Sequence, residues 1–249
     1  MDLGSKIMRR STISLFAAAL LFSTAAIAHP ELAVADKNRP AADAARDAAR
    51  HPAEMLAFAH IDHGKKVADF IPGGGYFTRL FAVAVKPGGG VVAIIPQAAV
   101  EHHAADAAAV TALGSNPAYG DITVVASPVE LKANSVDVFW TAQNYHDLHN
   151  APAGTIEGAN KAIFAAVKPG GYYVVIDHAA AAGSGLTATA TLHRIDSAVV
   201  KAEVTAAGFV FDGESRVLAN RADPHTANVF DPAIRGKTDQ FAYRFKKPM

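Results

Sequence analysis

The chain has 249 residues, of which 51% are hydrophobic and 18% are charged. Its 23 Lys and Arg balance 23 Asp and Glu, which argues against nucleic acid as a partner, since nucleic-acid-binding domains usually carry a basic excess. The absence of cysteine excludes disulfides, thiolate metal sites, iron–sulfur clusters and a cysteine nucleophile. The 11 histidines therefore supply most of the possible chemistry near neutral pH.

Residues 1–28 have the three parts of a secretory signal peptide. A basic start precedes an apolar run over 13–22, and small residues stand at the proposed cleavage site, Ala26 to Ala28. The apolar run is too short to span a bilayer, so no stable membrane insertion is expected once the signal is removed. We expect a mature chain that starts near His29 and is periplasmic or secreted; the alternative is an N-terminal amphipathic helix or anchor.

After this leader the pattern changes to a regular alternation of strands and helices. Residues 29–40 are expected to be either an arm that becomes ordered on contact or a loose leader, and 41–59 to be helical, with Pro52 dividing the helix and with about 41–62 forming a lid. The expected strands are 66–71, 91–95, 122–126, 136–141, 172–177, 209–218 and 240–245, and the expected helices are 76–85, 98–113, 156–167 and 196–207. Such alternation predicts a single α/β domain over 29–249 with a mostly parallel sheet.

A glycine turn, Gly73-Gly74-Gly75, joins the first predicted strand to the helix that follows it. Glycines in this position let the backbone approach a phosphate or nucleotide at the start of a helix. By itself the turn is weak support for a cofactor site, because any tight strand-to-helix turn favours glycine.

With its flanks, the segment from Asp69 to Tyr76 resembles the first motif of class I S-adenosylmethionine-dependent methyltransferases. Together with it, five further segments resemble an exported group of predicted methyltransferases: 46–54, 144–147, 168–171, 177–178 and 246–248. The resemblance covers nearly all of the predicted mature chain. It implies a Rossmann-like methyltransferase fold with a seven-stranded sheet, six strands parallel and one antiparallel near the C-terminus. It also implies that Gly73 to Gly75 lie under the methionine part of S-adenosylmethionine.

Two positions depart from the methyltransferase pattern. Ile71 occupies the first glycine position of the motif, and the second strand ends in Ile95-Pro96-Gln97 where the family has an acidic residue that binds both ribose hydroxyls. Gln97 offers one hydrogen bond in place of a charged bidentate pair, a loss of about 2 kcal/mol or more. S-adenosylmethionine is also scarce outside the cytoplasm. The sequence therefore favours no cofactor, with S-adenosylmethionine expected only if the family resemblance extends to function.

Polar side chains gather where the predicted strands end, which is where open α/β sheets bind ligands. The predicted catalytic residues are His146, His178, Tyr76, His193 and Arg194. The predicted substrate- or cofactor-binding residues are Gly73, Gly74, Gly75, Asn144, Tyr145, Asp147 and Asp177. The structural alternatives are a capping role for His146, a core position for Tyr76 and a surface helix that carries both His193 and Arg194.

The sequence does not predict a metal site. His146, Asp147, His149, Asp177 and His178 are suitable ligands, but the chain has no HExxH motif, and adjacent residues at one strand end do not easily bind the same ion. The sequence also argues against a serine hydrolase, because it contains no Gly-x-Ser-x-Gly turn.

The leading functional expectation is a cofactor-independent acid/base enzyme that acts on a small aromatic or hydroxylated substrate. Its concrete form is a carbon–carbon lyase that releases a small aldehyde such as formaldehyde, with one histidine removing a proton and His178, Tyr76 or Arg194 stabilising the charge. The first alternative is an S-adenosylmethionine-dependent methyltransferase with His146 as base. The second is a non-catalytic periplasmic binding protein. No sequence pattern indicates the oligomeric state.

Overall fold

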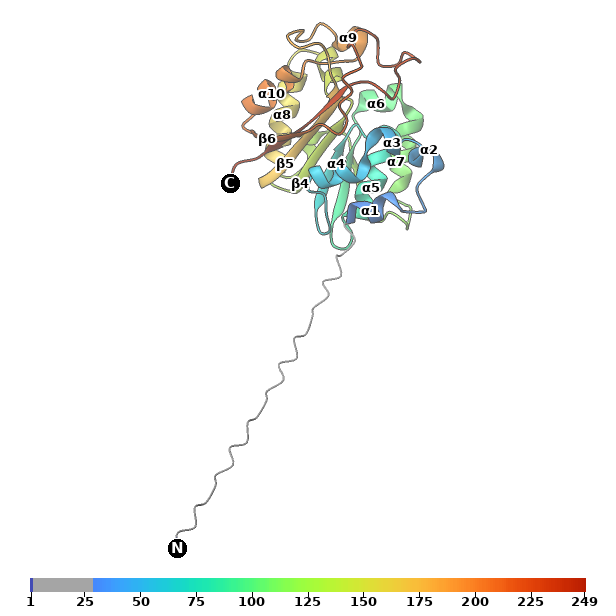
Figure 1. Ribbon diagram of the computed structural model, residues 1–249, viewed down its shortest axis with the longest axis vertical. Coiled ribbons are helices and arrows are strands. Elements are labelled where there is room, and N and C mark those ends of the chain that lie inside the picture. Colours follow the sequence, from blue (N-terminus) through green and yellow to red (C-terminus); the bar gives the residue numbers. More distant parts are fainter. Residues whose placement is uncertain (2–28) are drawn as a thin grey trace.

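The computed structural model describes Met1 and residues 29–249 (Figure 1). The predicted signal peptide lies outside the described residues. The described chain starts with helix α1 (His29–Val34), which packs on helix α5 (Tyr76–Ala84) and buries Ala33 completely. Of the two alternatives for 29–40, the first half of the segment is the arm ordered on contact and not the loose leader, because Ala33 gains apolar contacts in the core.

The sheet has seven strands in the order β3-β2-β1-β4-β5-β7-β6. The strands are β1 (Lys66–Phe70), β2 (Gly90–Ile94), β3 (Ile122–Val125), β4 (Val136–Ala142), β5 (Val167–His178), β6 (Val210–Ser215) and β7 (Gln240–Lys246). Only β7 runs antiparallel to its neighbours, β5 and β6. The predicted Rossmann-like methyltransferase topology, with one antiparallel strand near the C-terminus, is thus confirmed.

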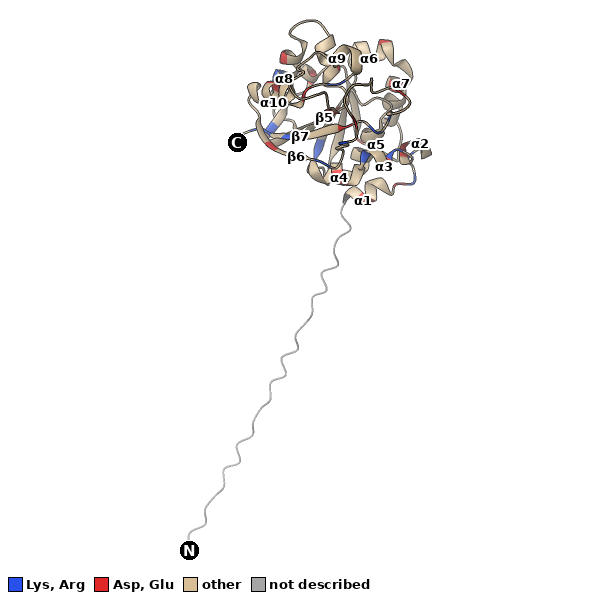
Figure 2. Ribbon diagram, turned by 45° about the horizontal axis from the view of Figure 1, so that its top comes forward, with Lys and Arg blue, Asp and Glu red and all other residues tan. Residues whose placement is uncertain are grey.

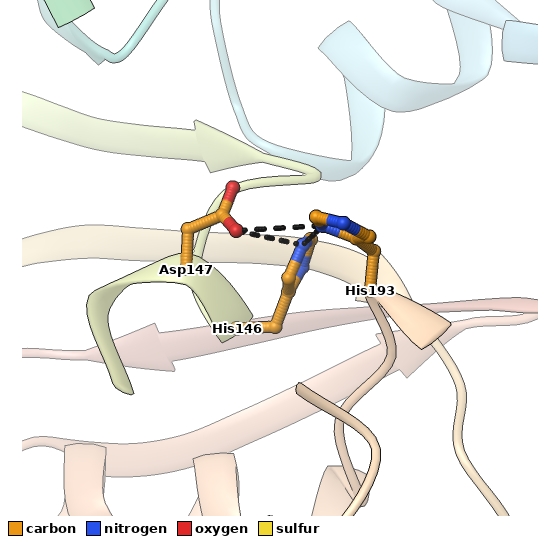
Figure 3. A group of neighbouring side chains, drawn as sticks. All are labelled: His146, Asp147 and His193. Carbon is orange, nitrogen blue, oxygen red and sulfur yellow. Dashed lines mark hydrogen bonds and ion pairs between the residues drawn. The ribbon is translucent and has the colours of Figure 1, made fainter. Parts of the chain in front are cut away.

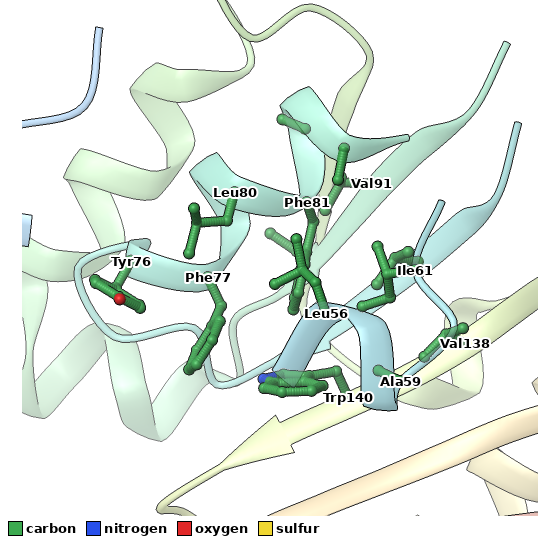
Figure 4. Packing of buried hydrophobic residues seen from close by; sticks show 14 of the residues in the cluster. Leu56, Ala59, Ile61, Tyr76, Phe77, Leu80, Phe81, Val91, Val138 and Trp140 are labelled. Atoms are coloured by element: carbon green, nitrogen blue, oxygen red, sulfur yellow. The ribbon is translucent and has the colours of Figure 1, made fainter. Parts of the chain in front are cut away.

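Helices cover both faces of this sheet (Figure 1). The remaining helices are α2 (Ala41–Ala44), α3 (Asp47–Arg50), α4 (Pro52–Phe58), α6 (Gln97–His102), α7 (Ala104–Leu113), α8 (Thr155–Ala166), α9 (Thr189–Leu192) and α10 (Ser197–Ala206), with 3₁₀ turns η1 (Pro128–Glu130) and η2 (His146–Asn150). Successive strand residues point to opposite faces, so Val138 and Trp140 join the core under α4 and α5 (Figure 4), whereas Phe139 joins the core under α8 and α10.

Three predicted boundaries needed correction. The helix expected over 98–113 is two helices, because the backbone of His103 leaves the helical region. Strand β5 starts at Val167 instead of 172, since Val167 pairs with Val136 and the turn at Gly170 bonds to Lys247. Strand β6 is shorter than the expected 209–218. Among the described helices, none has the length and apolar character needed to cross a membrane.

Candidate active site

A cavity of about 1150 Å³ opens at the carboxyl ends of the parallel strands, beside the point where the strand order reverses between β1 and β4. Open α/β sheets bind their ligands at such a point. Its walls come from the turns after β1, β2 and β4, the end of β5, the lid helix α3 and the 3₁₀ turn η2. A cavity of this size is large enough for a small molecule together with a nucleotide-sized ligand.

The glycine turn keeps the backbone geometry of the motif although its first glycine is replaced. Ile71 has a φ of 55°, a left-handed conformation that a β-branched residue rarely adopts, and Gly73 has a φ of 54°. Two hydrogen bonds hold Ile71 there, from its own N–H to the carbonyl of Ile94 and from Nδ2 of Asn144 to its carbonyl. Strain of this kind costs about 1–3 kcal/mol and is found mainly at functional sites. The turn is therefore a candidate ligand-binding element as well as a connection between β1 and α5.

Asp69 lies under this turn, and its buried carboxylate accepts one hydrogen bond, from Oγ1 of Thr78 at 2.6 Å. Burial raises the pKa of Asp69 to about 7, although the Thr78 bond opposes the shift. An acid whose folded pKa exceeds its unfolded pKa binds more protons in the folded state between those two values. Its contribution to stability is therefore lost as pH rises from about 4 to about 7.

We expect Asp69→Asn to remove this pH dependence while keeping an acceptor for Thr78. The free energy of unfolding of the variant minus that of the wild type should increase between pH 4 and pH 8, by up to about 4 kcal/mol. Urea unfolding at a series of pH values measures it. A difference that stays flat across this range would show that the carboxylate is ionised throughout.

His146 and Asp177 form a buried pair at the cavity wall. Nδ1 of His146 lies 2.8 Å from Oδ1 of Asp177, and the backbone N–H groups of His146 and His178 donate to the same carboxylate. Asp177 is fully buried and does not line the cavity. The carboxylate fixes the proton of His146 on Nδ1 and turns Nε2 toward the cavity, so the sequence-predicted binding role of Asp177 becomes an orienting one.

Two more side chains converge on Nε2 of His146 (Figure 3). Oδ1 of Asp147 lies 3.3 Å from this atom, Nδ1 of His193 lies 3.3 Å from it, and Asp147 and His193 are 3.6 Å apart. Asp147 comes from η2 and His193 from the end of α9, where a left-handed backbone (φ 53°) aims its ring inward. Phe230 packs edge-on against His193 at 4.9 Å between ring centres. We call His146, Asp147 and His193 the triad.

The two histidines at the ends of β4 and β5 have opposite electrostatic surroundings. Burial works against a charge on His146, but Asp177 and Asp147 outweigh it and raise the pKa of this histidine to about 10. Burial lowers the pKa of His178 to about 4 against the pull of Asp177, and Nδ1 of His178 lies 2.8 Å from Oγ1 of Thr238. A cation is therefore favoured at His146 and a neutral ring at His178. This differs from the expected base with an ordinary histidine pKa near 6.5, because two carboxylates face one ring.

The lid and the first residue of α5 together form an aromatic and cationic wall of the cavity. The hydroxyl of Tyr76 donates to Asp47 at 2.6 Å, and Arg46 and Arg50 stack over its ring at 4.8 and 4.7 Å. Burial lowers the pKa of Arg50 to about 10, and among the described residues its guanidinium makes one hydrogen bond, to Gln143, and no ion pair. Tyr76, which the sequence predicted to be catalytic, instead supports the guanidinium of Arg50 with its ring. Arg50, which was not predicted from the sequence, can bind an anionic group.

Besides Asp177, three sequence-predicted residues are held away from the cavity. Arg194 is fully buried and pairs with Asp223 at 2.8 Å, and it also donates to the carbonyls of Ala179 and Ala227. Tyr145 is buried against Glu203, and a Cβ at Gly75 would meet core side chains of α7. Catalytic or binding roles for these three have no geometric basis, because each faces the protein interior.

The other predicted residues line the cavity: Tyr76, Gly73, Gly74, Asn144, His146, Asp147, His178 and His193. His102 and His103 also line the cavity, and both are exposed. One signal could have suggested the pairing of His193 with His146. The two histidines follow the predicted strands 136–141 and 172–177, whose carboxyl ends meet at the same edge of a parallel sheet.

The side of the cavity where a methyltransferase would hold adenosine is open. Ile95 and Pro96 line it together with residues 126–129 after β3. Neither Ile95 nor Pro96 offers a carboxylate to ribose hydroxyls; the nearest acid in this wall is Asp106, whose Oδ1 lies 3.1 Å from the position of a Cβ at Gly74. The cavity is thus lined by Gly73 and Gly74 of the methyltransferase-like motif and lacks, at Ile95 and Pro96, the carboxylate that the family uses to bind the ribose.

No family model matches the chain, and no curated protein matches it. Solved structures do match. A SAM-dependent methyltransferase from Aquifex aeolicus is 19% identical with a TM-score of 0.56, over 81% of this chain and 92% of that one. The [4+2]-cyclase SpnF is 18% identical with a TM-score of 0.57, over 84% and 82%. A putative sarcosine dimethylglycine methyltransferase from Galdieria sulphuraria is 15% identical with a TM-score of 0.55, over 83% and 88%.

These likenesses establish the fold. The chain has the fold of class I S-adenosylmethionine-dependent methyltransferases, as its first motif predicted. One of the similar structures is named as a cyclase, so the reaction has to be argued from the site and not from the topology.

Proposed function

We propose that the protein is an enzyme that acts on a hydroxyl group of a small molecule at the triad. The observation that carries this proposal is the convergence of three polar side chains on one point of the cavity wall, with separations of 3.3, 3.3 and 3.6 Å. No packing requirement explains this convergence. A non-catalytic binding protein is less well supported, since it needs no buried carboxylate that orients a histidine.

The side chains divide the work as follows. His146 and Asp147 bind the hydroxyl, with the carboxylate of Asp147 placed to accept its proton, and the neutral His178 at the adjacent strand end offers a second hydrogen bond. Arg50 attracts an anionic group on the same molecule, and Phe77 and Phe230 supply apolar wall. Lys, Arg, Asp and Glu are otherwise intermixed over the elements (Figure 2), which suits a small-molecule partner better than nucleic acid.

Methyl transfer from S-adenosylmethionine is the first form of this reaction. The fold and the open adenosine side of the cavity support it. The residues that would hold the cofactor are the glycine turn, Gly73 and Gly74, and the wall at Ile95 and Pro96. When bound, the cofactor supplies an electrophilic methyl group; the chain binds the hydroxyl, removes its proton and excludes water.

A carbon–carbon lyase is the second form, and the missing carboxylate after β2 favours it, as does the proposed export of the chain. In a retro-aldol cleavage the hydroxyl proton passes to the enzyme and the carbon–oxygen bond becomes a carbonyl. The electron pair of the broken carbon–carbon bond stays on the remaining fragment, which takes up a proton. The products are a small aldehyde and the shortened substrate, and no oxidant or cofactor is needed.

Isothermal titration with S-adenosylmethionine separates these forms. If methyl transfer is correct, the wild type binds the cofactor, and Gly74→Val weakens binding by about tenfold or more, or about 1.4 kcal/mol, because the new side chain enters the cavity beside Asp106. Gly158→Ala is the matched control, since Gly158 also lines the cavity and a Cβ there meets no atom within 4 Å. No binding to the wild type would eliminate methyl transfer.

A product assay then tests the hydroxyl proposal itself. The protein is incubated with a panel of hydroxylated aromatic acids, with and without S-adenosylmethionine. Release of S-adenosylhomocysteine supports methyl transfer, and release of formaldehyde or another aldehyde without cofactor supports the lyase. Turnover that His146→Ala and Asp147→Asn leave unchanged would contradict the proposed site in either case.

A further inference from the structure

The triad has the ligand set and spacing of a metal site. A divalent ion bound by nitrogen and oxygen at about 2.0–2.2 Å in a tetrahedral or octahedral shell keeps its ligand atoms roughly 3.0–3.6 Å apart. The three separations in the triad are 3.3, 3.3 and 3.6 Å (Figure 3). One ion placed between Nε2 of His146, Nδ1 of His193 and Oδ1 of Asp147 can therefore bind all three without movement of the backbone.

The surroundings of His146 prepare it as a ligand. Asp177 occupies Nδ1 at 2.8 Å and is itself held by two backbone N–H groups, so Nε2 carries the free electron pair once a metal ion displaces the second proton of the ring. Metal-binding histidines commonly bond through their second nitrogen to a carboxylate in this way, which fixes the ring and increases its basicity. Sequence reasoning placed Asp177 among possible ligands; the structure places it behind one.

The charges at the triad also favour a cation. The carboxylates of Asp147 and Asp177 lie on opposite sides of the His146 ring, and Asp147 approaches both Nε2 of His146 and Nδ1 of His193. A single proton can neutralise only part of this charge and can bridge only two of the three atoms. An ion of charge +2 neutralises both carboxylates and bonds to all three ligand atoms.

We propose that the triad binds one divalent transition-metal ion of the zinc class, with open coordination positions directed into the cavity. Two imidazoles and one carboxylate suit zinc, cobalt or iron better than magnesium or calcium. The side chains of His193 and Asp147 are 30% and 49% exposed, so the remaining positions face the cavity and not the core. His146 and Asp147 are adjacent, but they lie on a 3₁₀ turn that directs both side chains to one point, so both can bind the same ion.

This inference deepens the proposed function and rests on it only for the role of the ion. A hydroxyl bound to a divalent ion loses its proton far more readily than a free one, by the same effect that brings the pKa of zinc-bound water to about 7. With the ion present, the hydroxyl would bind the ion in place of its direct contacts with Nε2 of His146 and Oδ1 of Asp147, and the ion would prepare the substrate oxygen for either methyl transfer or cleavage. Metal binding itself is independent of which reaction follows.

The test is direct titration of the chelator-treated, dialysed protein with Zn²⁺ by calorimetry and with Co²⁺ by visible absorption. We expect one site per chain and the d–d bands of a cobalt ion bound by nitrogen. His193→Ala and Asp147→Asn should each weaken Zn²⁺ binding by about 100-fold, and Asp177→Asn, which removes the orienting carboxylate, by about 10–100-fold. Both ligand variants alter partly exposed side chains, so their folds should persist, which melting curves check.

His51→Asn is the matched control. His51 is a half-buried histidine outside the cavity, and asparagine tolerates its left-handed backbone (φ 43°), so binding should be unchanged. No Zn²⁺ binding, or binding that the triad variants leave intact, would overturn the inference. These readouts need neither substrate nor S-adenosylmethionine, so failure of the metal site and failure of the proposed reaction can be told apart.

Discussion

His146→Ala is expected to lower turnover by about 10²–10⁴-fold, because it removes the ring that binds the substrate hydroxyl beside Asp147, the carboxylate that accepts the proton. Its Nε2 is the point on which Asp147 and His193 converge, so no neighbour can replace it. The rate of aldehyde or S-adenosylhomocysteine release, measured at saturating substrate with the panel compound that the wild type turns over, gives the result. A variant that keeps more than a tenth of the wild-type rate would remove His146 from the reaction.

The same substitution is expected to reduce stability, contrary to what its position in a loop after a strand indicates. His146 is only 2% exposed, and its loss leaves the buried carboxylate of Asp177 with backbone donors alone. Breaking a buried pair by removing one partner costs about 3–5 kcal/mol. Assays of His146→Ala therefore need a temperature well below its melting point, and His146→Ala with Asp177→Asn should recover part of the stability without recovering turnover.

Arg194→Met is expected to lower the free energy of unfolding by about 3–5 kcal/mol, because it leaves the buried carboxylate of Asp223 without its charged partner. The side chains of Arg194 and Asp223 are 0% and 1% exposed, and Arg194 also satisfies the carbonyls of Ala179 and Ala227. Urea unfolding measures the loss. Turnover per folded molecule should fall far less than in His146→Ala, since Arg194 does not reach the cavity.

Lys168→Met provides the contrast for Arg194→Met. Lys168 also pairs with an aspartate, Asp137 at 2.9 Å, but its side chain is 42% exposed, so its loss should cost no more than about 1 kcal/mol. If Arg194→Met proved as stable as the wild type while turnover collapsed, the catalytic role that the sequence suggested for Arg194 would be restored.

The alternation of strands and helices could be predicted from the sequence because it depends on local spacing. Apolar runs of five or six residues, separated by glycine and proline turns, predicted six of the seven strands, and the ten-residue segment 209–218 predicted the seventh. The resemblance carried by the motif from Asp69 to Tyr76 predicted their topology. Errors arose where tertiary contacts decided the outcome: α1 exists because Ala33 packs on α5, and β5 starts early because Val167 pairs with Val136.

The site was predictable in its location and not in its contacts. The sequence by itself determined that His146, Asp147 and His178 follow neighbouring strands, since parallel strands bring their carboxyl ends to one edge. Only the tertiary structure decided that His193 joins His146 while Arg194, one residue later, is buried with Asp223. Adjacent residues after a short helix point in different directions, and which of them meets the cavity depends on backbone angles and long-range packing that no local pattern encodes.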